Sequence, residues 1–184
     1  MRFSIDQRER CGITKLLREC DSGSLRLVGT VGLRDLILEG GHGPRVAALR
    51  IGGNDLMHAL GVRRLDLAVV SHGDNDHAGG FAGVARVFPP GRTLAPPGMP
   101  GLLEVRSCIA GMHWQWDGVD FRFLHPGRHF PYLDNESSCV LRVEAHGRVA
   151  LLPGDIGEVV ERMLVRAQDP ALRADVVLVP PGSP

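Results

Sequence analysis

The sequence predicts one layered α/β domain, because short apolar strands alternate with helices along most of the chain. Residues 65–71 form a continuous apolar run, which is typical of a strand buried on both faces. Segments 114–123 and 139–152 each alternate around a turn containing glycine, and so predict two antiparallel hairpins. Segments 78–87 and 157–167 predict helices. Helices interleaved with both buried and hairpin strands indicate a mixed α/β architecture.

The first fifty residues carry a weaker pattern. Leu25–Val28 and Leu36–Leu38 are the strand candidates there. The pattern improves near residue 53, where Asn54–Leu60 predicts a short helix that begins at an asparagine cap and ends before a glycine. We therefore expect a poorly defined N-terminal segment over residues 1–52 and the partial α/β domain over residues 53–184.

Composition excludes some function classes. The chain has 184 residues, enough for one sizeable core, and Lys plus Arg balances Asp plus Glu at 21 each. A neutral chain has no global field to attract nucleic acid, so any DNA contact must come from a local patch or a partner. No apolar run reaches the ~18–20 residues that span a bilayer, and the charged start lacks a signal-peptide core. As written, the chain is expected to be cytoplasmic.

Four cysteines occur, at Cys11, Cys20, Cys108 and Cys139, and none forms a C-x-x-C pair. Such spacing is not that of a zinc site. We expect free or buried thiols rather than disulfides or metal ligands.

Candidate metal ligands gather in one loop directly after the apolar run of residues 65–71. His72, Asp74, Asp76 and His77 fall within six residues. Imidazole nitrogens and carboxylate oxygens suit a divalent ion of borderline or hard character. His72 and Asp74 can point one way while Asp76 and His77 point the other, so one loop can serve two ions. The alternative is a solvated loop whose aspartates cap the following helix.

Further candidates lie beyond that loop. Asp155 follows a buried strand in a turn where its carboxylate could bridge two ions; the alternative is a helix cap. Asn135 and Ser138 precede another buried strand and could orient substrate or water, although either could be an ordinary loop residue. With Asp76 they are the candidate catalytic residues. The remaining histidines are expected to be surface or packing residues: His42, His58, His113, His125, His129 and His146.

Taken together, these residues resemble the C-terminal metallo-β-lactamase-like domain of ComEC-type DNA-internalisation competence proteins. The resemblance covers about residues 53–182, and its ordered series is more specific than the H-x-D-x-D-H loop alone. Its landmarks are residues 60–66, 70–80, 114–119, 124–126, 135–141, 154–156 and 174–180.

The resemblance implies an αββα sandwich that holds two divalent ions, and a phosphodiesterase-like role in which one strand of incoming DNA is degraded. It implies DNA as the partner and a membrane channel domain upstream in the full-length, inner-membrane-associated protein. The wider superfamily has His where Asp74 stands, and a carboxylate makes Mn²⁺ plausible beside Zn²⁺.

The chain departs from the family pattern at both ends. The family's opening Asp-Val-Gly-Gln-Gly-Asp-like segment is absent, and Leu38–Gly41 has Glu where the family has Asp. After a last predicted strand, Asp175–Val179, Pro180–Pro184 stands where the family has a histidine pair. We therefore expect a fragmentary copy that retains one or two ions and has weak or no nuclease activity. The alternatives are an inactive remnant or a small-molecule metallo-hydrolase.

Overall fold

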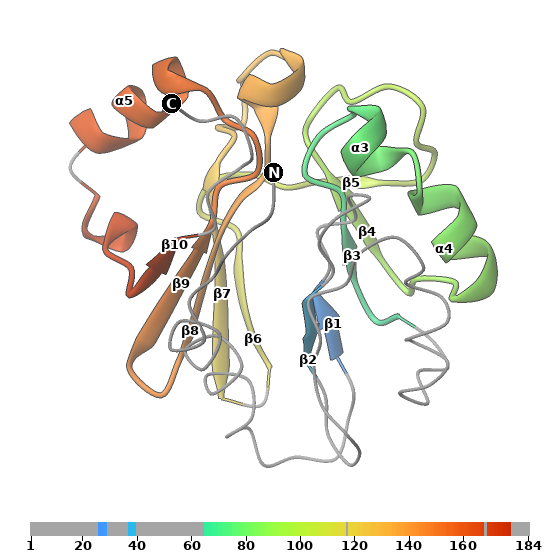
Figure 1. Cartoon of the computed structure of the whole chain (residues 1–184), viewed down its shortest axis with the longest axis horizontal. Coiled ribbons are helices and arrows are strands. Elements are labelled where there is room, and N and C mark those ends of the chain that lie inside the picture. Colours follow the sequence, from blue (N-terminus) through green and yellow to red (C-terminus); the bar gives the residue numbers. More distant parts are fainter. Residues whose placement is uncertain (1–25, 29–36, 40–64, 117, 168, 178–184) are drawn as a thin grey trace.

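The computed structural model describes residues 26–28, 37–39, 65–116, 118–167 and 169–177; for residues 26–28, 37–39, Asn75 and Asp76 it describes the backbone alone. Two β-sheets face each other, and helices lie on their outer sides (Figure 1). The predicted α/β class and the αββα order of layers are both confirmed.

The smaller sheet contains three parallel strands in the order β3-β4-β5. They are β3 (Ala68–Val69), β4 (Thr93–Ala95) and β5 (Arg106–Ser107). The helices α3 (Asn75–Ala78) and α4 (Phe81–Val87) connect β3 to β4 and lie outside this sheet. The parallel order places the carboxyl ends of all three strands at one edge.

The larger sheet has five strands in the order β10-β9-β8-β7-β6. Its antiparallel part is formed by β6 (His113–Trp116), β7 (Val119–His125), β8 (Val140–Ala145) and β9 (Arg148–Leu152). The last strand, β10 (Val176–Val177), pairs parallel with β9. Both predicted hairpins are confirmed.

The outer face of the larger sheet is covered by α5 (Glu158–Arg166), and two short 3-10 turns, η1 (Asp134–Ser137) and η2 (Pro170–Leu172), complete this half. Val160 of α5 packs with Leu151 of β9. Among the residues described, no helix is long and apolar enough to cross a membrane.

Alternation along the strands explains the layers. Val69 packs between the two sheets with Phe121 and Leu141, whereas its neighbours Ala68 and Val70 pack against the α4 side. β3 is therefore buried on both faces, which is why residues around it form an unbroken apolar run. Burial on both faces fixes the strand's orientation, because a shift by one residue would exchange the two sets of side chains.

Some expectations for local structure need correction. Regular pairing in the predicted strand 65–71 is confined to β3, with one isolated bridge between Leu65 and Pro90. The predicted helix 78–87 is divided into α3 and α4 by the glycines Gly79 and Gly80. Glycine at this point weakens a continuous helix by its backbone freedom.

The N-terminal strand candidates are confirmed as β1 (Arg26–Val28) and β2 (Ile37–Glu39), an antiparallel pair. The expected helix 54–60 and the expected boundary between residues 52 and 53 lie outside the described residues. The division into a poorly defined segment and a partial domain stays a prediction.

The expectation of free thiols is wrong for Cys108 and Cys139, which form a disulfide across 31 positions of sequence. Their Cα atoms lie 5.9 Å apart because the facing of the two sheets brings the end of β5 beside the start of β8. This pairing has no local sequence signal. Cys11 and Cys20 lie outside the described residues.

Candidate metal centre

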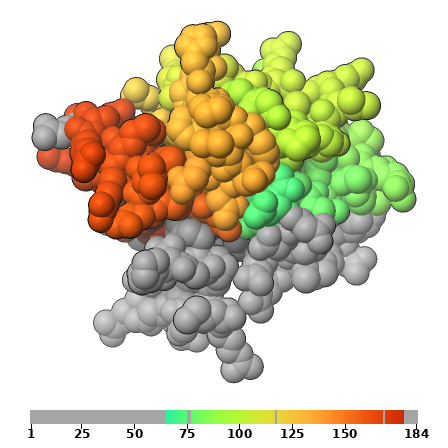
Figure 2. Space-filling view, turned by 90° about the horizontal axis from the view of Figure 1, so that it is seen from above, coloured from blue at the N-terminus to red at the C-terminus, as the bar shows by residue number. Residues whose placement is uncertain are grey.

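The candidate site lies at the edge where β3 and β9 end and β8 begins. The loop after β3 contributes Ser71 and His72, α3 contributes His77, the start of β8 is preceded by Ser138, and the turn after β9 contributes Asp155. In the view onto this edge, the teal surface at the end of β3 adjoins the orange surface of the β7–β8 connection (Figure 2). The site is thus shared between the two sheets.

Three side chains converge there. His72, His77 and Asp155 each offer a ligand atom, and these atoms all lie within 4.8 Å of one another. The Nε2 atom of His77 lies 3.0 Å from Oδ2 of Asp155. The side chains of His72, His77 and Asp155 are 0%, 16% and 20% exposed, so the group is largely shielded but reachable from solvent.

Serine hydroxyls meet the other nitrogen of each ring. The Nδ1 atom of His72 lies 3.2 Å from Oγ of Ser71 and 3.2 Å from Oγ of Ser138. Ser71 Oγ also lies 3.4 Å from Nδ1 of His77. When Nδ1–H donates to a hydroxyl oxygen, Nε2 keeps its lone pair, which is the arrangement that supports a metal-binding imidazole. Both Nε2 atoms face carboxylates, toward Asp74 and Asp155.

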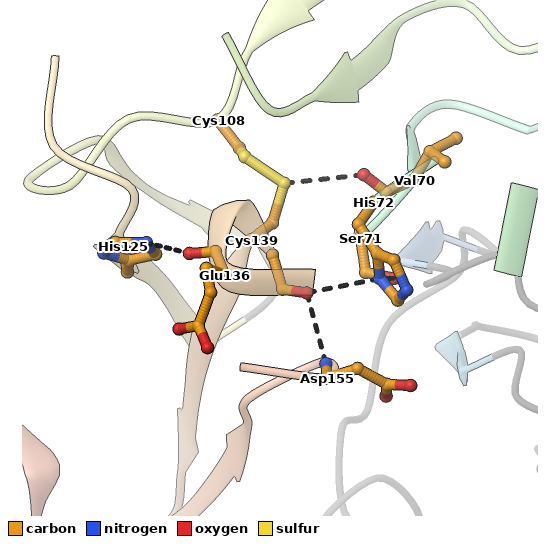
Figure 3. The surroundings of a disulfide bond; sticks show 9 residues. Val70, Ser71, His72, Cys108, His125, Glu136, Cys139 and Asp155 are labelled. Atoms are coloured by element: carbon orange, nitrogen blue, oxygen red, sulfur yellow. Dashed lines mark hydrogen bonds between the residues drawn. A yellow bond between two sulfur atoms is a disulfide. The ribbon is translucent and has the colours of Figure 1, made fainter. Parts of the chain in front are cut away.

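Ser138 also connects His72 to Asp155. The backbone N–H of Asp155 donates to Ser138 Oγ at 3.2 Å (Figure 3). The turn needs a glycine beside it, because Gly154 has a φ of 64° and a Cβ there would lie 2.7 Å from the Cβ of Ser138. One buried hydroxyl therefore holds a histidine from one sheet and an aspartate backbone from the other.

Tyr132 supports the same loop from above. The N–H of Gly73 donates to the Tyr132 hydroxyl at 2.9 Å, and a Cβ on Gly73 would collide with that hydroxyl. Burial raises the pKa of Tyr132, the Gly73 hydrogen bond opposes this rise, and the charges of Asp134 and Asp74 add to it. The phenol stays neutral at ordinary pH and fixes the backbone between His72 and Asp74.

His125 supports the loop that leads to Ser138. Its Nε2–H donates to the carbonyl oxygen of Glu136 at 2.8 Å, and its ring packs edge-on against Phe130. Burial lowers the pKa of His125, while the Glu136 carbonyl and carboxylate act in the opposite direction. The packing role expected for this histidine agrees with its burial, which leaves it 1% exposed.

The structure brings together four residues predicted from sequence: His72, His77, Asp155 and Ser138. Asp74 lies beside them, with its Oδ2 3.8 Å from His72 Nε2 and its side chain 44% exposed. Asn135 is exposed on η1 and does not belong to the three-residue group. The side chain of Asp76 lies outside the part of the chain that the structure describes.

Sequence reasoning gave no role to Ser71, Tyr132 or Gly154. Ser71 directly precedes His72 at the point where the loop turns, and this position could have predicted a contact between its hydroxyl and a neighbouring histidine ring. Nothing local to Tyr132 indicates its contact with Gly73, 59 positions away.

The donors present fit a divalent ion. Two imidazole nitrogens and one carboxylate at mutual distances under 4.8 Å match the ligand set of Zn²⁺ and related borderline ions, and Asp74 adds a hard oxygen donor nearby. Hydroxyl partners on Nδ1 of both histidines supply the outer contacts that metal-binding histidines usually have.

The chain is an αββα sandwich that carries, at the shared edge of its sheets, a three-residue group with the donor set of a divalent-metal site. The chain belongs to the metallo-beta-lactamase superfamily, whose family model matches residues 30–181.

Among curated proteins, the chain is 46% identical to the competence protein ComA of Neisseria gonorrhoeae over 120 residues, which are 65% of this chain and 17% of ComA. It is 33% identical to recombination protein 2 of Haemophilus influenzae over 103 residues, which are 55% of this chain and 13% of that protein. The chain thus spans less than a fifth of either relative. The resemblance to competence proteins of the ComEC type is confirmed.

Among solved structures, the diiron beta-hydroxylase CmlA from Streptomyces venezuelae matches with a TM-score of 0.50 and 15% identity, over 85% of this chain and 34% of CmlA. A mutant of the same beta-hydroxylase gives a TM-score of 0.52 at 17% identity, over 80% of this chain and 33% of that chain. At these identities the likeness concerns the fold.

Proposed function

We propose that this chain provides a metal-dependent hydrolase domain that cleaves phosphodiester bonds of DNA during its uptake. The observation that carries the proposal is the convergence of His72, His77 and Asp155 at the shared edge of the two sheets. The identity to a competence protein and to a recombination protein, both named for processes that act on DNA, supports DNA as the substrate.

Different residues of the chain would hold the ion, orient its ligands and contact the substrate. His72, His77 and Asp155 would hold a divalent ion, and Asp74 and Asp76 are the further proposed ligands. When bound, such an ion polarises a phosphoryl oxygen and lowers the pKa of water.

Ser71 and Ser138 orient both imidazole rings so that each Nε2 atom faces a carboxylate. Asn135, exposed on η1, is proposed to contact substrate.

The oxygen donors favour Mn²⁺ as well as Zn²⁺ as the working ion. Since the chain corresponds to a small part of its relatives, the full-length protein is proposed to carry a membrane channel domain and to work at the inner membrane. The neutral charge balance of this chain means that DNA capture would depend on that larger context.

DNA cleavage by the purified chain tests the proposal. Metal-free protein is reloaded with Mn²⁺ or Zn²⁺ and given end-labelled single- and double-stranded DNA, with a panel of lactone and thioester substrates in parallel. The proposal predicts DNA cleavage that is slow in this chain, depends on the added metal and is abolished by chelation. Asp155→Asn should lower the rate by about a hundredfold, because it removes a charged ligand.

His113→Ala is the matched control, because His113 is exposed on β6 and bonds to the nearby Gly111 carbonyl. It should retain the wild-type rate. Equal rates for wild type and Asp155→Asn would refute the proposal. Turnover of a lactone or thioester without DNA cleavage would show that the domain is a small-molecule hydrolase and not a nuclease. The weak or absent nuclease activity that the sequence predicts for this chain stays a prediction, which the absolute wild-type rate tests.

A further inference from the structure

The Cys108–Cys139 disulfide lies beside the segment Val70–Ser71, which leads into the candidate metal-binding loop. Cys108 follows β5 in the smaller sheet and Cys139 precedes β8 in the larger one, so the bond joins the two sheets (Figure 3). Both residues are 0% exposed. The N–H of Cys108 donates to the carbonyl of Ala95 at 2.8 Å, which fixes that half to the end of β4.

The other half of the disulfide is held against the metal-binding loop. The N–H of Cys139 donates to the carbonyl of Ser71 at 2.9 Å, and the Sγ of Cys139 lies 3.5 Å from the carbonyl oxygen of Val70. Cys139 also directly follows Ser138. Cys139 is therefore linked to both serines that contact the Nδ1 atom of His72. It is hydrogen-bonded to Ser71 and follows Ser138 in the chain.

We propose that the disulfide is a positioning device for the metal centre. By tying β5 to β8, it fixes the separation between Ser71 and Ser138, and so the orientation of His72 and the place of the Asp155 backbone. In the dithiol form the two sulfurs are no longer bonded and move apart to van der Waals contact. The Ser71 and Ser138 hydroxyl groups then no longer lie at the distance from each other that orients His72. The site therefore binds metal more weakly. The inference rests on the metal centre of the proposed function.

The redox step balances through thiol–disulfide exchange. Two thiols of the chain lose two electrons and two protons to a disulfide-bearing partner such as oxidised glutathione, which leaves as two thiols. Because both sulfurs are fully buried, the exchange occurs during folding rather than on the finished molecule. Disulfides persist in oxidising compartments and are rare in the cytosol, so the tight-binding form is the one that folds in an oxidising environment.

Metal affinity measured in the two redox forms tests the proposal. The chain is folded with oxidised or with reduced glutathione, the thiol content is checked by alkylation and mass, and Zn²⁺ affinity is measured by competition with a chromophoric chelator. The disulfide form should bind about tenfold more tightly than the dithiol form or Cys108→Ser/Cys139→Ser, a size typical of lost outer contacts to metal ligands.

Two further variants separate positioning from general stability. Val143→Ala opens the same core within β8 at a residue outside the hydrogen bonds to Ser71 and Ser138, so it should lower stability and keep the affinity. Ser138→Ala leaves the disulfide in place and should reproduce the loss of affinity. If the double variant Cys108→Ser/Cys139→Ser does not fold, Ser138→Ala still tests the proposal.

The outcomes are distinct. Equal affinity in both redox forms would overturn the proposal, as would full affinity in Ser138→Ala or an equal loss in Val143→Ala. Absence of Zn²⁺ binding in every form would overturn this proposal and the proposed function together. A redox-dependent affinity without DNA cleavage would support the positioning role and count against the nuclease alone.

Discussion

Single hydroxyl groups set the chemistry of the candidate centre at the residue scale. Ser138 is buried, accepts the N–H of Asp155 and lies within hydrogen-bond distance of Nδ1 of His72, so it contacts two of the candidate ligand residues. Asp155 and His77 then approach each other to 3.0 Å. A small displacement of this hydroxyl would shift the positions of both His72 and Asp155. Substitutions that move Ser138 should therefore weaken metal binding.

Gly154→Ala is expected to damage both stability and metal binding. The φ of 64° costs a non-glycine residue about 1–2 kcal/mol, and the new Cβ would lie 2.7 Å from the Cβ of Ser138. Metal affinity should fall about tenfold because Ser138 must move. Urea unfolding and Zn²⁺ competition measure the two effects. Gly127→Ala, where a Cβ meets nothing within 4 Å, is the control; a Gly154→Ala protein that behaves like it would contradict the account.

His125 predicts how stability depends on pH. Burial lowers its pKa in the folded state, so the unfolded chain binds the proton more readily. The stability that the neutral ring provides is therefore present above the ordinary histidine pKa of ~6.5 and is lost as the pH falls toward the lowered folded value. Metal-free protein should lose unfolding free energy between pH ~7 and ~5 more steeply than its His125→Gln variant.

Urea unfolding at several pH values measures that slope. Glutamine can still donate to the carbonyl of Glu136 but does not titrate in this range. His129→Gln is the matched substitution at an exposed histidine. Identical slopes for wild type and His125→Gln would show that another group governs the acid sensitivity.

At the element scale, the hairpins carry local signals, whereas the short parallel strands β4 and β5 do not. β8 and β9 are joined by His146 and Gly147, both with positive φ, at 50° and 72°. Such a two-residue turn matches the twist of antiparallel strands. Glycine accepts this conformation at no cost, whereas histidine pays a steric penalty there.

His146→Asn is expected to stabilise the protein by about 0.5 kcal/mol, because asparagine adopts the left-handed conformation more readily at the first position of this turn. Gly147→Ala should destabilise it by about 1–2 kcal/mol for the opposite reason. Thermal and urea unfolding of both variants provide the comparison. A loss of stability in His146→Asn would contradict this description of the turn.

The same distinction explains what the sequence could reveal. The turn glycines and alternating residues predicted β6 to β9, and the density of ligands after β3 predicted His72 and His77 as part of a site. β4 and β5 were missed because parallel strands of three and two residues have no periodicity of their own. The disulfide and the Tyr132 contact were missed because only the packing of distant segments creates them. The expected role of Asn135 in orienting substrate or water stays a prediction, and its side chain is exposed on η1.

At the scale of the whole molecule, the candidate centre exists only when the two sheets face each other. His72 and His77 come from the smaller sheet and its helices, while Asp155 and Ser138 belong to the larger one. The apolar side chains of both sheets interlock between them, and the disulfide joins them at the edge that bears the ligands. The site is therefore a property of the assembled sandwich.

The metal content of the purified chain tests whether His72, His77 and Asp155 hold a divalent ion. Protein stripped with a chelator is reloaded with Zn²⁺ or Mn²⁺, separated from free ion and analysed for metal, beside His77→Ala/Asp155→Ala and the control His113→Ala. We expect at least about one firmly held ion per chain in the wild type and the control. The double variant should lose that ion, because it retains one of the three converging ligands. A double variant that folds and holds as much metal as the wild type would contradict the account.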